Sequence, residues 1–186
     1  MGVLGLGPTL YMKAQPGEFP PDTTPEGAYL RIAVAVRDDH LEGAFAYLET
    51  ASQWACFTTR DYRKKGYDLV AASYPVPERS RLLGQYRLAA ESIDAADYFA
   101  REARARGWLA RLRRDLSGIA RTEVQGERAT IETVRKTRYA FRRRENGIWG
   151  LTLFTAELTA EAQLAARDES VVEKAAADYR SAEAPR

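Results

Sequence analysis

The feature that most constrains this chain is a change in the spacing of its apolar residues near Ile119. From residue 119 to about 154, apolar and polar side chains alternate, as in strands with one buried and one solvated face. Short turn sequences interrupt the alternation: Gln125-Gly126-Glu127, Arg135-Lys136 and Asn146-Gly147. Asn-Gly suits a two-residue type I′ hairpin, in which both central residues need positive φ. The pattern predicts an antiparallel meander of four strands.

In the residues before 119, the apolar side chains follow a different spacing. Apolar residues recur there every three or four positions, which is typical of helices with one buried stripe. The first helix is expected to begin after Thr23 or Thr24, either of which can cap it. A later helix is expected to begin at Ser52, to turn Trp54 and Phe57 inward and to end at Gly66.

Length and composition fit one α+β domain. The chain has 186 residues, of which 45% are hydrophobic, enough for one domain with a substantial core. Residues 1–22 are rich in Gly and Pro and are expected to form an extended arm. We expect residues 23–155 to form the domain, with helices packed on a curved antiparallel sheet. Residues 156–186 predict an added C-terminal helix that packs on the domain or on a partner.

Two hairpin segments resemble the nuclear-transport-factor-like superfamily, which also contains the ketosteroid isomerases. Val124-Gln125-Gly126-Glu127-Arg128-Ala129-Thr130-Ile131 is similar to its "V-x-G-[DE]-x-A-x-[IV]" hairpin. Tyr139-Ala140-Phe141 followed by Asn146-Gly147-Ile148-Trp149 resembles its "Y-x-F … G-x-W" closing hairpin. The likeness covers residues 24–154, and two features depart from it: a long helical stretch over 80–116 and the helix after Phe154.

The resemblance implies a cone-shaped fold, in which a curved sheet wraps around a helix and encloses an apolar cavity. Enzymes of the superfamily place an acid–base residue in that cavity, whereas many relatives, envelope lipoproteins among them, serve as binding or structural modules. We therefore interpret the chain as a non-catalytic binding or scaffold domain for a small apolar ligand or a protein partner. The alternative is a small-molecule isomerase, dehydratase or cyclase. Self-association as a homodimer, through the sheet or the terminal helix, is a further expectation.

The residues that could carry acid–base chemistry are few. His40 is the only histidine, and its ordinary titration range suits proton transfer at neutral pH. Asp61 and Asp97, each followed by a tyrosine, could supply the carboxylate and phenol of an isomerase site. The competing interpretation places His40 in a solvated turn and both aspartates on solvated helix faces.

Charge is unevenly distributed along the chain. Residues 101–144 carry 14 basic and 5 acidic side chains, within a chain whose net charge is only +2. This segment could bind an anionic partner. The candidate residues are Arg111, Arg113, Arg114, Arg142, Arg143 and Arg144. Acidic neighbours and the missing nucleic-acid motifs argue against nucleic acid and favour solvated faces.

Other sites and the compartment are weakly constrained. One cysteine, Cys56, and one histidine exclude a Cys-based zinc site and a two-histidine metal site, and no motif indicates a cofactor. No stretch is apolar for the length that a membrane-spanning helix needs. The apolar start, Gly2 to Gly7, fits either a cytosolic protein or an envelope protein whose leader has been removed.

Overall fold

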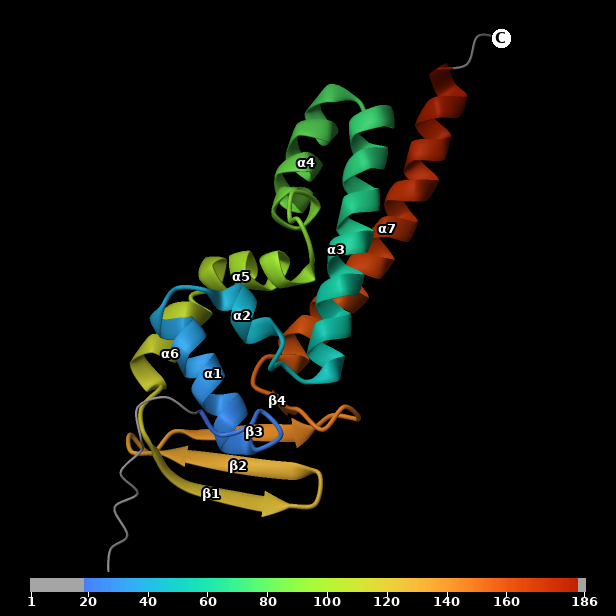
Figure 1. Cartoon of the computed structure of the whole chain (residues 1–186). Helices are drawn as coiled ribbons and strands as arrows, with labels where there is room; N and C mark the ends of the chain where they lie inside the picture. The colour runs from blue at the N-terminus through green and yellow to red at the C-terminus, as the bar shows by residue number, and fades with distance from the viewer. Residues whose placement is uncertain (1–18, 184–186) are drawn as a thin grey trace, which may run out of the picture.

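The computed structural model describes residues 19–183, and the fold is α+β as predicted. Helices α1 (Pro25–Arg37), α2 (Leu41–Phe45), α5 (Ala95–Ala105) and α6 (Trp108–Asp115) lie near the sheet. Helices α3 (Thr50–Ser73), α4 (Val76–Ala90) and α7 (Thr155–Glu183) form an arm that projects away from it (Figure 1). The apolar start, Gly2 to Gly7, and most of the extended segment predicted over 1–22 lie outside the described residues.

The sheet is the predicted four-strand antiparallel meander. Its strands are β1 (Ile119–Gln125), β2 (Arg128–Thr133), β3 (Arg138–Arg143) and β4 (Trp149–Leu151), in the order β1-β2-β3-β4. In β2 and β3 buried residues alternate with more exposed ones, so one face meets the helices and the other meets solvent. Val124 in β1 is exposed, because β1 is an edge strand and its end lies beyond the helices.

The hairpin turns differ in detail from the prediction. Asn146 does not reach positive φ, so the two-residue type I′ turn expected at Asn146-Gly147 is wrong. Arg144 N–H instead donates to Ile148 C=O, which leaves a three-residue loop with Gly147 at φ 82°. The Asn146 side chain accepts a hydrogen bond from Ile148 N–H at 3.1 Å, and this contact stabilises the longer loop. At the first hairpin Gly126, with φ 59°, supplies the left-handed residue of a two-residue turn.

Helix α1 packs across the inner face of the sheet. Thr24 caps it by accepting from Gly27 N–H, and Pro25 occupies its first turn, as predicted. Tyr29 and Ile32 are buried, and the Tyr29 ring lies 5.7 Å from the ring of Tyr139 in β3. This contact sets the distance between α1 and the sheet.

Helix α3 corrects three predictions. It begins at Thr50 rather than at Ser52, which is buried inside the helix. Helix α3 does not end at Gly66 but continues to Ser73, because Gly66 is buried against the ring of Tyr86 in α4, 3.2 Å from where a Cβ would stand. Trp54 and Phe57 were expected to face inward, yet they are 66% and 45% exposed. The face of α3 that packs on α7 is lined instead by small and polar residues.

A partly buried charge cluster separates the main core from the core of the arm. The Arg63 guanidinium donates to Glu161 at 3.1 Å and to Asp168, both on α7, and lies 4.8 Å from the centroid of the Tyr86 ring. Burial disfavours the cation, but the two carboxylates outweigh it, so the pKa of Arg63 is raised. Beyond the cluster, a second core forms around Val70, Tyr74, Tyr86, Val172 and Ala176.

The sheet joins the helices through a close backbone contact at Gly150. Leu48 and Leu151 form a parallel bridge, with Leu151 N–H donating to Tyr47 C=O and Glu49 N–H donating to Leu151 C=O. A Cβ on Gly150 would stand 2.5 Å from the Glu49 Cα. Only glycine lets the two backbones approach this closely.

Gly150→Ala should therefore destabilise the fold by about 1–3 kcal/mol, because the methyl group meets rigid backbone. Gly84→Ala is the matched control: its Cβ meets nothing within 4 Å on the exposed side of α4, and alanine there should stabilise by about 0.5–1 kcal/mol. Urea unfolding of the two variants measures both effects. Equal stability of the two variants would contradict the close approach.

Candidate functional site

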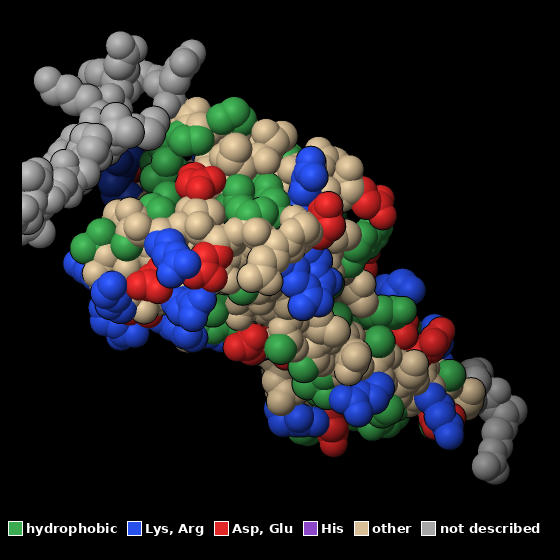
Figure 2. Space-filling model, turned by 90° about the horizontal axis from the view of Figure 1, so that it is seen from below, with side chains coloured by type: hydrophobic (Ala, Val, Ile, Leu, Met, Phe, Trp, Pro, Cys, Tyr) green, Lys and Arg blue, Asp and Glu red, His purple; other side chains and the backbone are tan. Residues whose placement is uncertain are grey.

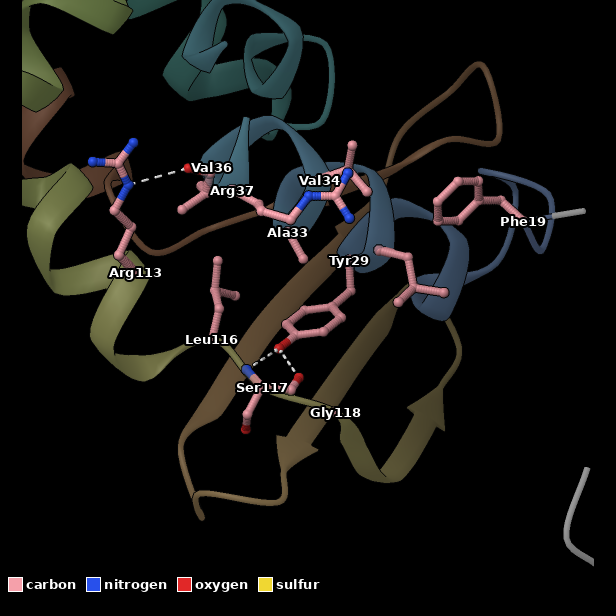
Figure 3. Close-up of a pocket in the computed structure, with 11 residues that line it drawn as sticks. Phe19, Tyr29, Ala33, Val34, Val36, Arg37, Arg113, Leu116, Ser117 and Gly118 are labelled. Carbon is pink, nitrogen blue, oxygen red and sulfur yellow. Dashed lines mark hydrogen bonds between the residues drawn. The ribbon is translucent and has the colours of Figure 1, made fainter. Parts of the chain in front are cut away.

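An open groove lies beside α1. Its volume is about 750 Å³, within the roughly 300–1,000 Å³ typical of small-molecule sites. Figure 3 shows one wall formed by α1 and the other by the chain that links α6 to β1. Phe19 lies at one end and Arg113 at the other. The apolar lining comes chiefly from Phe19, Tyr29, Leu30, Ala33, Val34 and Leu116.

The groove exists because α1 is apolar on two faces. The run Ile32-Ala33-Val34-Ala35-Val36 covers more than half of the helix circumference. Ile32 is turned into the core and Val36 is buried at the floor of the groove, whereas Ala33 and Val34 are half-buried and line it. The second apolar face of α1 is therefore only partly covered by residues 19–183.

Tyr29 holds the two walls of the groove together. Its hydroxyl donates to Ser117 C=O at 2.6 Å and accepts from Ser117 N–H at 3.1 Å. Both main-chain groups of Ser117 are thus bound to one side chain of α1, 88 residues away. Burial raises the pKa of Tyr29, and the hydrogen bond to Ser117 offsets this in part, so the phenol stays neutral at physiological pH.

Two arginines border the groove, Arg113 at the end away from Phe19 and Arg37 beside Val34 (Figure 3). Arg113 Nε donates to Val36 C=O at 3.3 Å, and its NH2 lies 3.3 Å from Asp39. Arg37 pairs with Asp38 through two hydrogen bonds of 2.6 and 3.0 Å, and this pairing raises the pKa of Arg37. Each guanidinium carries five N–H donors. Two of its nitrogens make the contacts described, so each guanidinium keeps donors for a further acceptor.

The structure places the three candidate acid–base residues on separate elements, and none of them lines this groove. His40 precedes α2 with its side chain 71% exposed, 3.4 Å from Glu42, and lies in a smaller hollow that shares Phe19 and Val34 with the groove. Asp61 is exposed on α3 beside Arg60. Asp97 accepts from Ile93 N–H and from Arg101. Burial opposes its ionisation, but these two contacts prevail and lower its pKa.

The six candidate anion-binding arginines form two groups at opposite ends of the sheet. Arg135, in the turn after β2, bonds Arg114 C=O, which places the α6 group beside that turn. The other group ends β3, where Arg142 pairs with Glu49 at 3.9 Å, Arg143 with Glu127 at 3.8 Å, and Arg144 donates to Ala46 C=O and Gln53. Arg111 and Arg114 both pair with Asp115. On the face drawn in Figure 2, basic and acidic side chains are interleaved.

Cys56 is buried in the main core, and burial raises its pKa to about 12, so the thiolate is scarce at neutral pH. Within residues 19–183 no group of three or more His, Cys, Asp and Glu side chains is placed to hold a metal ion. In the same part of the chain, no helix has the length and apolar character to cross a membrane.

Arg113 was predicted from the sequence as a candidate anion-binding residue, but the groove that it borders was not predicted. The five-residue apolar run of α1 was the available signal, since a helix packed on one side alone needs only one apolar stripe. Comparison of the chain with known protein families, with curated proteins and with solved structures gave no match.

Replacing Tyr29 with Phe should destabilise the protein by about 1–2 kcal/mol, because both main-chain groups of Ser117 lose their partner. The folded state raises the Tyr29 pKa, so its contribution is complete below about pH 10 and is lost as pH rises through the folded value. The stability difference between Tyr29→Phe and the parent protein should therefore shrink above about pH 10. Urea unfolding at a series of pH values measures it.

Tyr62→Phe is the control, since its hydroxyl has no hydrogen-bond partner among the described residues. If Tyr29→Phe were no less stable than this control at neutral pH, the two hydrogen bonds between Tyr29 and Ser117 would not stabilise the contact between α1 and the α6–β1 link.

Proposed function

We propose that the protein is a non-catalytic binding domain that holds an apolar group in the groove between α1 and the α6–β1 link. The observation that carries the proposal is the second apolar face of α1, with Leu30, Ala33 and Val34 only partly covered. Apolar surface exposed in a concave site lowers its free energy by binding apolar matter, at about 25 cal/mol per Å² removed from water.

The chemistry of the lining supports binding rather than catalysis. Among the described residues that line the groove, Tyr29 is the only one with a phenol, carboxyl, imidazole or thiol group, and its hydroxyl is already bound by Ser117. A general acid or base must reach its substrate with a free proton-transfer site. The arginines at the rim keep their charge at all physiological pH values and suit ion pairing instead.

The order of helices followed by a meander also agrees with the nuclear-transport-factor-like resemblance, which stays a proposal. In that interpretation, the groove would be the opening of the cavity between helix and sheet. The buried contact of Tyr29 with Tyr139 supports this placement, since it sets α1 directly over the inner sheet face. Self-association and attachment to the cell envelope stay expectations of the resemblance.

Filling the groove tests the proposal. Ala33→Trp places an indole ring on the groove wall and should weaken binding of N-phenylnaphthylamine, an uncharged fluorophore that brightens in apolar sites, by at least about tenfold. Ala71→Trp adds the same ring to an exposed position on α3 and should leave binding unchanged. Equal probe binding by both variants, each folded by circular dichroism, would refute the assignment.

A further inference from the structure

The groove is apolar along its length and positive at one end, which restricts the ligands that fit it. Phe19 lies at one end of the groove and Arg113 at the other, where α6 approaches the end of α1, whereas the Arg37 side chain extends back along α1 toward Val34 (Figure 3). A ligand that satisfies both parts must itself be apolar at one end and negatively charged at the other.

Charges around the arginine end leave a positive balance. Five arginines and three carboxylates are linked there by ion pairs or lie in direct contact with the α6–β1 link, a balance of two positive charges. The arginines are Arg104, Arg111, Arg113, Arg114 and Arg135, and the carboxylates are Asp39, Glu42 and Asp115.

Two of the carboxylates at this end each pair with two arginines, so the arginines outnumber the negative charges that pair with them. Asp39 lies within 3.5 Å of both Arg104 and Arg113, and Asp115 lies within 3.9 Å of both Arg111 and Arg114. Arg135 uses its guanidinium on Arg114 C=O and has no ion-pair partner within residues 19–183. An anion arriving at this end therefore meets donors that the protein leaves partly unused.

We propose that the groove binds a monomeric single-chain amphiphile with an anionic headgroup, its alkyl chain along α1 and its headgroup at Arg113. This ligand class rests on the proposed function, since it needs the apolar groove, and it adds the polarity and direction of the ligand. The volume of about 750 Å³ accommodates such a chain. Each methylene taken up by the groove should tighten binding about fourfold.

The experiment compares three twelve-carbon probes below their micelle concentrations by isothermal titration: dodecyl sulfate, dodecanol and dodecyltrimethylammonium. We expect dodecyl sulfate to bind at least about tenfold more tightly than the other two, and to lose affinity as salt is raised. Equal affinities for the three probes would overturn the anionic headgroup while leaving the apolar groove intact. Failure of N-phenylnaphthylamine to bind would remove the proposed function itself.

One variant locates the headgroup. Arg113→Gln should weaken dodecyl sulfate about fivefold and leave dodecanol unchanged. The Arg113 side chain is 46% exposed, so its replacement should not disturb folding. Arg142→Gln, an arginine at the far end of the sheet, is the control and should bind dodecyl sulfate as the parent does. Loss of affinity in the control alone would overturn the assigned headgroup position.

A final experiment distinguishes binding of a free amphiphile from binding to a membrane surface. The protein is sedimented with vesicles of phosphatidylcholine containing phosphatidylglycerol, at the same salt concentration as the titrations. Binding of monomeric dodecyl sulfate without co-sedimentation supports the proposal. Co-sedimentation without binding of the monomer would overturn it in favour of a lipid surface.

Discussion

The two hydrogen bonds between the Tyr29 hydroxyl and the main chain of Ser117 fix the geometry on which the candidate site depends. They join the first helix to the point where the chain leaves α6 and enters the sheet. Because Tyr29 also packs on Tyr139, one side chain sets both the height of α1 above the sheet and its distance from the α6–β1 link. A groove with fixed walls is the consequence, and a preformed site loses less entropy on binding than one that must first be ordered.

The rest of the molecule isolates this groove from the helical arm. Arg63 with Glu161 and Asp168 forms a partly buried ionic contact between the arm and the main core, in which Arg63 is the most buried member. Arg106 extends the cluster by joining Glu161 to Glu102 on α5. The arm is thereby held by specific charges rather than by apolar contact alone, and the surface it exposes, with Trp54 and Phe57, is separate from the groove.

Much of the fold is encoded locally and could be predicted from the sequence. The meander follows from the alternation in β2 and β3 and from three turn sequences, and the first helix from Thr24 and Pro25. The predictions failed where a contact between residues far apart in the sequence determines where a helix ends or which side chains are buried. Gly66 continues a helix because Tyr86 packs on it, and Trp54 is exposed because α7 packs on the small-residue face of α3. The groove needs a contact between residues 29 and 117, which no local pattern contains.

The central claim is that the apolar face of α1 and the α6–β1 link together bind a ligand. Titration of isotope-labelled protein with monomeric dodecyl sulfate, followed by amide chemical shifts, tests it most directly. The account predicts that the largest shifts fall on Ala33, Val34, Ser117 and Gly118, with little change along the exposed face of α3. Shifts centred on Trp54 and Phe57, or spread evenly over the surface, would contradict it.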